Sequence, residues 1–320
     1  MEKRCVMSAL KTIISGISAL SLENEIALGK ISSFEYQEIS TDLELKNALQ
    51  DCDIFWFRLN HKLTNAILNK VRCKYILCAA TGLDHIDLEA CTLNNIRVIS
   101  LKGEFEFLKE VRATAEHTLS LLLTLIRKSK NVFQHTEGGA WNRYLFKGTE
   151  LYKKKVGVLG LGRLGKIMAD YYAVLGMEVF YYDTENQPEY SVKYNKVNTM
   201  ESLLSIVDVL SIHLPYNKNT HFILNKSNLY LLKETSVIVN TARGGLVNEN
   251  DLLKLLIEKK IGGYATDVLL GEPDIKKHPL ITYARLNDNV IITPHIGGNT
   301  FESIEKTETF ILDKLIKIIK

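Results

Sequence analysis

The chain contains 320 residues, of which 46% are hydrophobic and 24% are charged. These proportions are typical of a soluble globular protein, and the length suggests about two domains of roughly 150 residues each. The formal net charge of +3 is too small to indicate a nucleic-acid surface. No apolar run reaches the ~18 residues that a transmembrane helix needs. We therefore expect neither a nucleic acid nor a membrane as a partner.

The chain has an odd number of cysteines, which form no C-x-x-C pair and lack metal-ligand spacing; they are Cys5, Cys52, Cys73, Cys78 and Cys91. We expect reduced, mostly buried thiols in a cytoplasmic protein, without a disulfide framework or a metal site. The apolar stretch of residues 5–22 resembles a signal peptide only superficially, because Lys11 interrupts it and no A-x-A cleavage site follows. We expect a structural segment there.

Two blocks of alternating strand and helix patterns follow along the chain. In the first block Thr41 is placed to cap a helix, and a parallel sheet covered by helices is indicated. The expected strands of this block are residues 34–39, 53–59, 75–79 and 97–100, and the expected helices are 42–49 and 63–70. A long helix is expected over residues 111–130.

The second block predicts a doubly wound sheet. Its expected strands are residues 156–159, 178–182, 209–212, 236–240, 264–268 and 290–293. The tail, residues 303–320, has the pattern of an amphipathic helix with a basic last turn, which favours the helix dipole. We interpret it as a terminal helix docked on the protein.

A glycine-rich loop is the strongest local signal. Gly160, Gly162 and Gly165 form G-x-G-x-x-G directly after an apolar strand, and a helical pattern opens at once. Gly160 permits the tight turn, Gly162 lets the backbone approach a pyrophosphate, and Gly165 lets the helix pack closely on the strand. The helix N-terminus then offers N–H groups and the positive end of its dipole to phosphates. The pattern predicts a dinucleotide site.

An acid at the end of the next strand favours NAD over NADP. Asp183 lies 18 residues after Gly165, where a carboxylate accepts hydrogen bonds from the adenosine ribose. It would repel a 2′-phosphate, and the next residues, Thr184 and Glu185, offer no arginine to neutralise one. The alternative is a surface aspartate that begins a loop.

Polar groups follow the carboxyl ends of later strands, at the edge of a parallel sheet where ligands bind. Arg243 supplies a planar, always charged fork that matches a carboxylate. His295 titrates near neutrality and can pass a proton, and Glu272 beside it would stabilise the imidazolium. Taken singly, each has another interpretation: a surface arginine, a turn residue before Pro273 and a helix-capping histidine.

Further motifs are LGLGRLG, HLP from His213, NTARGGLVNENDLL from Asn240, the segment 267–273, TPHIGG, ATGLDHIDLEA from Ala80 and ATAEHTL from Ala113. With them the chain resembles the D-isomer-specific 2-hydroxyacid dehydrogenases over about residues 50–300. The stretch WNRYLFKGTEL, residues 141–151, most resembles the D-3-phosphoglycerate dehydrogenase branch.

The resemblance implies an enzyme that interconverts a D-2-hydroxy acid and its 2-oxo acid by hydride transfer with NAD. Arg243 would bind the substrate, His295 would be the acid/base and Glu272 its partner. The implied substrate-binding residues are Arg58, Ala80, Thr81, Gly82 and Arg243. Asp267 would contact the nicotinamide amide, and the implied cofactor-binding residues are Gly160, Gly162, Arg163, Leu164, Gly165, Asp183, His213, Leu214, Pro215, Thr241, Ala242, Asp267 and Gly297.

The resemblance also implies an α/β fold with two doubly wound parallel-sheet domains, in which a Rossmann cofactor domain is inserted into a flavodoxin-like substrate domain. The expected boundaries are 1–112 and 297–320 for the substrate domain and 113–296 for the cofactor domain. The helix around residues 113–130 and the segment from Trp141 would form a homodimer contact.

The substrate stays open at this point. Arg58, Lys62 and Arg143 lie where the phosphoglycerate branch has basic residues, so D-3-phosphoglycerate is one candidate and an unphosphorylated 2-oxo acid such as hydroxypyruvate or glyoxylate is another. Two stretches depart from the family pattern: the first 30 or so residues, which depart from the usual opening strand and whose structure stays open, and the acidic segment with Glu104 and Glu106.

A non-catalytic, NAD-sensing corepressor is the alternative from another functional class. The remaining histidines are weaker candidates for the site. His117 is interpreted as structural within the long helix, and His278 precedes Pro279 in a loop without a strand to position it.

Overall fold

The computed structural model describes residues 10–185 and 187–319, so the predictions for Cys5 and for the rest of residues 1–9 lie outside the described residues. The chain divides into two compact units. Unit 1 is the described part of Met1–Leu108 with Thr300–Lys320, and unit 2 is Lys109–Asn299. Unit 1 is thus formed by two chain segments that flank unit 2 in sequence.

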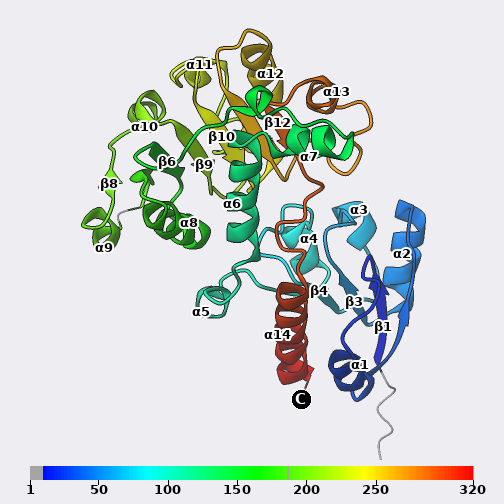
Figure 1. The fold of residues 1–320 in the computed structure, drawn as a ribbon. Coiled ribbons are helices and arrows are strands. Elements are labelled where there is room, and N and C mark those ends of the chain that lie inside the picture. The colour runs from blue at the N-terminus through cyan, green and yellow to red at the C-terminus, as the bar shows by residue number, and fades with distance from the viewer. Residues whose placement is uncertain (1–9, 186, 320) are drawn as a thin grey trace, which may run out of the picture. The chain divides into compact units, whose positions relative to one another are not determined.

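Unit 1 contains a five-stranded parallel sheet in the order β2-β1-β3-β4-β5 (Figure 1). This order is that of flavodoxin-like doubly wound folds, as predicted. The strands are β1 (Leu10–Ser15), β2 (Ser32–Tyr36), β3 (Ile54–Phe57), β4 (Tyr75–Cys78) and β5 (Arg97–Ser100).

The opening strand β1 lies in the region whose structure the sequence left open. β1 pairs with β2 on one side and with β3 on the other, and its Ile13 and Ile14 are fully buried. The Thr12 hydroxyl lies 2.8 Å from that of Ser32, so the polar side chain is satisfied inside the unit. A strand covered on both faces is a short apolar run without alternation, which is hard to distinguish from a helix segment by pattern alone.

The helices of unit 1 are α1 (Leu22–Gly29), α2 (Asp42–Asp51), α3 (Asn65–Leu68), α4 (Leu88–Leu93), α5 (Phe105–Leu108) and α14 (Phe301–Ile319). Thr41 caps α2 as predicted, in a capping box with Glu44. The docking of the terminal helix is also confirmed. Ile311, Leu312 and Leu315 are buried, and α14 contacts α1, β4 and β5.

Unit 2 contains a seven-stranded parallel sheet in the order β12-β11-β10-β9-β6-β7-β8, which is the Rossmann order with an added strand (Figure 1). All six predicted strands are present, and only the two-residue edge strand β8 was not predicted. The strands are β6 (Lys155–Leu159), β7 (Glu178–Tyr182), β8 (Asn195–Lys196), β9 (Val209–Ile212), β10 (Val237–Asn240), β11 (Gly263–Thr266) and β12 (Val290–Ile292).

The helices of unit 2 are α6 (Ala113–Ile126), α7 (Ser129–Glu137), α8 (Arg163–Val174), α9 (Pro188–Ser191), α10 (Met200–Ile206), α11 (Lys226–Leu229), α12 (Glu249–Ile257) and α13 (Pro279–Leu286), with 3₁₀ turns η1 (Arg143–Phe146) and η2 (Gly244–Leu246). The long helix predicted over residues 111–130 is present as α6, but its predicted C-terminal end is wrong. It ends at Ile126, and Lys128 has a left-handed backbone with φ of 55° that redirects the chain into α7.

Two apolar clusters form the core of unit 2. Neighbouring residues of β9, Val209 and Leu210, belong to different clusters, because successive side chains of a strand point to opposite faces. Both faces of the sheet are therefore buried, as the predicted doubly wound sheet requires. The four described cysteines, Cys52, Cys73, Cys78 and Cys91, are buried, as predicted. In the described part of the chain we find no helix with the length and apolar character needed to span a bilayer.

One carboxylate in the docked face of α14 is buried without a full set of partners. Glu308 is 1% exposed, and its Oε1 lies 3.4 Å from Nε of Arg58. Burial raises the pKa of Glu308 to about 7, and the Arg58 charge opposes this only in part. The folded state consequently binds more protons than the unfolded chain between about pH 4.5 and pH 7, so stability from this group is lost as the pH rises through that range.

We expect Glu308→Gln, which removes the ionisable group, to gain stability relative to the wild type as the pH rises. From pH 5 to pH 8, the unfolding free energy of the variant minus that of the wild type should increase by on the order of 2 kcal/mol. Urea unfolding at both pH values measures it. Glu302→Gln, an exposed change in the same helix, is the control. A Glu308→Gln difference that does not vary with pH would contradict the assignment.

Candidate functional site

The glycine loop has the geometry of a phosphate cradle. Gly160 adopts φ of 92°, and a Cβ there would lie 2.9 Å from the His213 carbonyl oxygen. A Cβ at Gly165, in the first turn of α8, would collide with the carbonyl of Gly160. A Cβ at Gly162 would meet no atom within 4 Å, so the approach to the N-terminus of α8 is open. The strand, turn and helix needed for a dinucleotide pyrophosphate are therefore all present.

Asp183 lies at the end of β7 and supports the same loop. Its Oδ2 accepts a hydrogen bond from Leu161 N at 2.6 Å, and its Oδ1 accepts one from Glu185 N at 2.8 Å. Each carboxylate oxygen retains a lone pair, and the side chain is half-buried rather than enclosed. It can therefore accept from ribose hydroxyls while it repels a 2′-phosphate.

His213 lies under the loop and is held neutral. Its Nε2 lies 2.8 Å from the Ser211 hydroxyl, which also accepts from the Tyr172 hydroxyl at 2.9 Å. Burial lowers the pKa of His213 to about 3, and the charge of Arg163 adds to the effect. Arg163 itself donates to the Val111 carbonyl at 3.1 Å. His213 is thus a neutral polar support below the loop rather than a proton donor at neutral pH.

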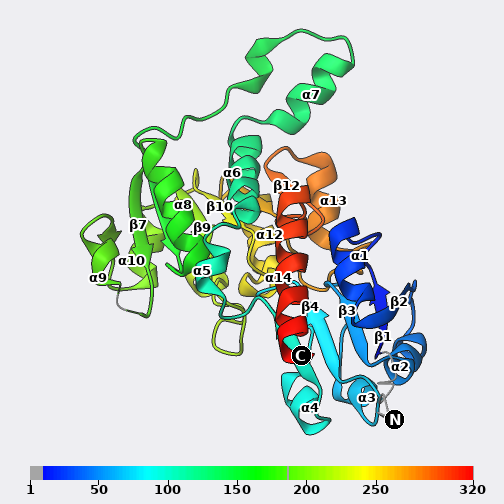
Figure 2. The same cartoon turned by 90° about the horizontal axis from the view of Figure 1, so that it is seen from below.

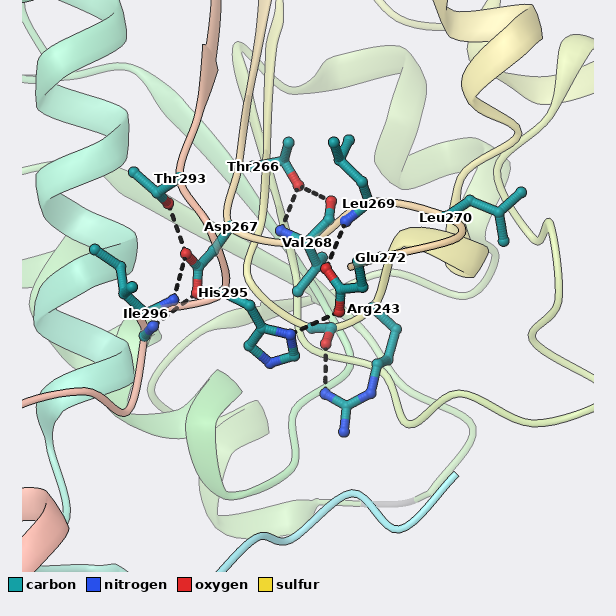
Figure 3. Close-up of polar contacts among 12 residues, drawn as sticks. Arg243, Thr266, Asp267, Val268, Leu269, Leu270, Glu272, Thr293, His295 and Ile296 are labelled. Carbon is teal, nitrogen blue, oxygen red and sulfur yellow. Dashed lines mark hydrogen bonds and ion pairs between the residues drawn. The ribbon is translucent and has the colours of Figure 1, made fainter. Parts of the chain in front are cut away.

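Three side chains from different strand ends converge at one site in unit 2 (Figure 3). Arg243 follows β10, Glu272 lies in the turn after β11, and His295 follows β12. His295 Nδ1 lies 2.6 Å from Glu272 Oε1, and Glu272 Oε2 accepts from Leu269 N at 3.0 Å. The Arg243 guanidinium donates to the Ala242 carbonyl at 2.8 Å. In Figure 3 it lies below the Glu272 carboxylate, as the His295 ring does.

A buried carboxylate fixes the backbone that carries His295. His295 has φ of 55°, a conformation that few side chains adopt, and its N–H donates to the Asp267 carbonyl at 2.8 Å. The Asp267 side chain accepts from Ile296 N at 2.9 Å and from Gly297 N at 2.7 Å (Figure 3). These bonds close the loop around a single side chain.

Asp267 also ties this loop to α6 and β12. The Thr293 hydroxyl donates to Oδ1 at 2.6 Å, and His117 Nε2 lies 3.2 Å from the same oxygen. Burial alone would raise the pKa of Asp267, but the hydrogen bonds from His117, Thr293 and the two amides outweigh it and lower the pKa below its ordinary value. Through these hydrogen bonds the carboxylate holds the loop. Its predicted contact with the nicotinamide amide stays a prediction.

The other predicted cofactor residues of unit 2 surround this edge of the sheet. The Thr241 hydroxyl lies 2.7 Å from that of Thr118, and Ala242 N donates to Asn240 Oδ1 at 3.0 Å. Leu164 and Leu214 are half-buried, and Pro215 is exposed at the end of the HLP segment. Their role as cofactor contacts is a prediction.

The predicted substrate residues of unit 1 lie at the carboxyl edge of its own sheet. Arg58 follows β3 and pairs with Glu308. Residues 80–82 follow β4, where Ala80 N donates to the Cys78 carbonyl at 2.7 Å. The acidic segment forms α5, and its Glu104 pairs with Lys314 of α14 at 2.5 Å. Glu104 is therefore engaged in holding the terminal helix.

Two histidines outside the predicted catalytic set contact buried carboxylates near the site, and the sequence did not reveal these contacts. His117 was interpreted as structural, and it contributes to the Asp267 network. His278 was set aside as a loop residue, yet its Nε2 lies 2.9 Å from a buried carboxylate of Glu249. Glu249 stands one residue after the cap of α12, inside the NTARGGLVNENDLL motif, and only its burial distinguishes it from an ordinary first-turn acid.

Comparison with known proteins agrees with this geometry. The family model described as D-isomer specific 2-hydroxyacid dehydrogenase, NAD binding domain, matches residues 119–297. The D-3-phosphoglycerate dehydrogenase of Methanocaldococcus jannaschii is 33% identical over 88% of this chain, which spans only 53% of that protein's length. The glyoxylate reductase of Thermofilum pendens is 31% identical over 87% of this chain and 81% of its own.

A solved structure is similar over nearly the whole described fold. The D-lactate dehydrogenase of Aquifex aeolicus, complexed with NAD and lactic acid, superposes with a TM-score of 0.82 at 27% identity and covers 96% of this chain and 95% of its own. The family model matches more than half of the chain, on the domain that carries the glycine loop and the Arg243, Glu272 and His295 cluster. The chain therefore belongs to the D-isomer specific 2-hydroxyacid dehydrogenase family and is an oxidoreductase that uses NAD as its cofactor.

Proposed function

We propose that this chain interconverts D-3-phosphoglycerate and phosphohydroxypyruvate, with Arg243, Glu272 and His295 as its catalytic residues. The observation that carries the reaction class is the convergence of an arginine fork and a carboxylate-bound imidazole in the unit that carries the glycine loop (Figure 3). The similarity to curated D-3-phosphoglycerate dehydrogenases supports this particular substrate pair.

Each side chain has a distinct chemical task. Bound NAD supplies or accepts the hydride. Arg243 binds the substrate carboxylate and polarises the carbonyl, since a guanidinium fork matches a planar anion. His295 holds the proton that moves to or from the substrate oxygen. Because Glu272 accepts from Nδ1, the proton that is exchanged with substrate resides on Nε2.

The chain's own residues also explain how NAD is held. The N–H groups at the start of α8 face the open side of Gly162 and bind the pyrophosphate. Asp183 accepts from the ribose hydroxyls while it braces the loop through Leu161. Thr241, Ala242 and Gly297, which follow β10 and β12, contact the nicotinamide end of the cofactor.

A specific observation favours a second candidate, an unphosphorylated 2-oxo acid such as glyoxylate or hydroxypyruvate. Arg58, the predicted phosphate ligand, already pairs with buried Glu308 at 3.4 Å. A carboxylate so close offsets the charge that a phosphate dianion would need. The similarity to a glyoxylate reductase points the same way.

We expect His295→Asn to lower kcat by at least about 10²–10⁴-fold, the range of general acid/base catalysis. Asparagine accepts the left-handed backbone of this position, so the loop is preserved. NADH oxidation with a panel of 2-oxo acids measures the rate, and fluorescence titration should show unchanged NADH affinity. Turnover close to that of the wild type would remove His295 from the catalytic role.

The substrate is tested by kcat/KM for phosphohydroxypyruvate against hydroxypyruvate and glyoxylate. If Arg58 binds the phosphate, Arg58→Gln should reduce kcat/KM for the phosphorylated acid by roughly tenfold to a hundredfold, the worth of a charge-assisted hydrogen bond, and leave the others nearly unchanged. Lys74→Gln, an exposed change of a lysine outside the candidate phosphate ligands, is the control. A wild-type preference for the unphosphorylated acids, insensitive to Arg58→Gln, would establish the second candidate instead.

We also propose that the chain is a homodimer through the segment of α7 and η1, residues 129–146, here called the arm. Figure 2 shows α7 and the segment after it standing out from the rest of unit 2, and none of the α7 residues is buried. Trp141 is 92% exposed and Tyr144 is 78% exposed. Large apolar side chains gathered in this way mark a protein interface, and an identical arm on a second copy would cover them.

We expect the double variant Trp141→Ala and Tyr144→Ala to sediment as a monomer at concentrations where the wild type is a dimer. The variant removes the exposed aromatic area that association would bury, while no core contact is lost. Analytical ultracentrifugation measures the change, with exposed Val174→Ala of α8 as a control. A monomeric wild type would refute the arm as a dimer contact.

A further inference from the structure

A buried carboxylate outside the catalytic cluster contacts the turn that carries Glu272. Glu249, at the start of α12, is 6% exposed, and both of its carboxylate oxygens lie 3.2 Å from Leu270 N. The Leu270 side chain is itself exposed, so the backbone N–H is the part of this residue that the protein holds. Glu249 thus anchors the middle of the turn between Leu269 and Glu272.

His278 completes this anchor from the other side. Its Nε2 lies 2.9 Å from Glu249 Oε2, and it stands directly before α13. Its Nδ1 is buried and has no hydrogen-bond partner among the described residues. A protonated Nδ1 would bury an unsatisfied N–H, so the geometry favours a neutral ring that donates from Nε2 to Glu249.

The anchored turn contacts the Glu272–His295 pair on one side and the segment next to Arg243 on the other. Leu269 N donates to Glu272 Oε2, and Glu272 Oε1 contacts His295 Nδ1. On the other face of the turn, a Cβ added to Gly244 would collide with the backbone of Leu269 and Leu270. Arg243 immediately precedes this close contact, so a displacement of the turn would disturb the guanidinium and the imidazole together.

We propose that Glu249 and His278 are positioning residues that fix the Glu272 turn and thereby the relative placement of Arg243 and His295. The inference rests on the proposed function, since it concerns the same catalytic side chains. We call the pair of Glu249 and His278 the clamp. A misplacement of about 1 Å in an active site can cost 10²-fold in rate, so we expect loss of the clamp to lower the rate of the chemical step strongly and to change substrate binding little.

The charges around the clamp fit a role in holding rather than in proton transfer. Burial raises the pKa of Glu249 to about 7, with the Leu270 hydrogen bond opposing and the charge of Glu272 adding. Burial lowers the pKa of His278. The titratable groups that face Glu249 are His278, Glu272 and Tyr264, and neither Glu249 nor His278 contacts the His295 ring.

The test compares three replacements of Glu249 in the full chain. Glu249→Ala removes both contacts, Glu249→Asp keeps the acid but shortens its reach, and Glu249→Gln keeps an oxygen that can accept from Leu270 N. We expect kcat to fall roughly tenfold to a hundredfold in the Ala and Asp variants, with KM and NADH affinity within about twofold of the wild type. The Gln variant should keep more of kcat than the Ala and Asp variants, because its oxygen still accepts from Leu270 N while its amide NH2 faces His278. Exposed Glu258→Ala at the end of α12 is the matched control.

The outcomes separate positioning from a merely structural role. Equal kcat in all variants, or a rise in KM and loss of NADH binding that follow a fall in Tm, would overturn the proposal. If the Ala variant does not fold, the Asp and Gln pair decides in the same way. If the wild type reduces no 2-oxo acid, the proposed function fails, and hydrogen exchange decides this inference: faster exchange at residues 269–272 in the Asp variant supports the clamp, and unchanged exchange refutes it.

Discussion

The site depends on one buried carboxylate more than on any other group. Asp267 directly follows β11. Its carboxylate accepts hydrogen bonds from the two amides after His295 and from the Thr293 hydroxyl, and it contacts His117 of α6. Its hydrogen bonds stabilise the ionised form in a place where burial alone would disfavour it. Because an unpaired charge there would be costly, the loop can close only in the arrangement that satisfies all of these donors. That arrangement presents the His295 ring to Glu272.

Three carboxylates at this edge of the sheet differ in surroundings and therefore in task. Asp267 is buried and accepts hydrogen bonds from two backbone amides and two side chains, so it holds the backbone of the loop. Glu272 is partly exposed and contacts the imidazole directly. Glu249 is buried, and burial raises its pKa because the Leu270 hydrogen bond opposes that effect only in part. The same functional group thus holds a loop, orients a ring and, by our proposal, anchors a turn, according to the number of N–H groups that each one meets.

Much of the fold was predictable because local pattern and tertiary environment agree. The glycine loop and the β6, β7 and β9 strands were found within a residue of their bounds, since buried parallel strands are short apolar runs between turns. The prediction was incomplete where local pattern is ambiguous. β1 lacks alternation, and the end of α6 is set by the left-handed backbone of Lys128, which the apolar periodicity around it does not reveal.

The sequence by itself determined the α/β class, the dinucleotide loop, the preference for NAD and the identity of Arg243, Glu272 and His295 as candidates, because each rests on residue type and short spacing. Only the tertiary structure decided which side chains meet. Glu249 and His278 are 29 residues apart, and Arg58 and Glu308 are 308 − 58 = 250 residues apart, yet each pair is in contact. The burial of a side chain and its hydrogen-bond partners depend on elements that are distant in sequence. Only these properties distinguish a charged residue on the surface from one that holds the site in place.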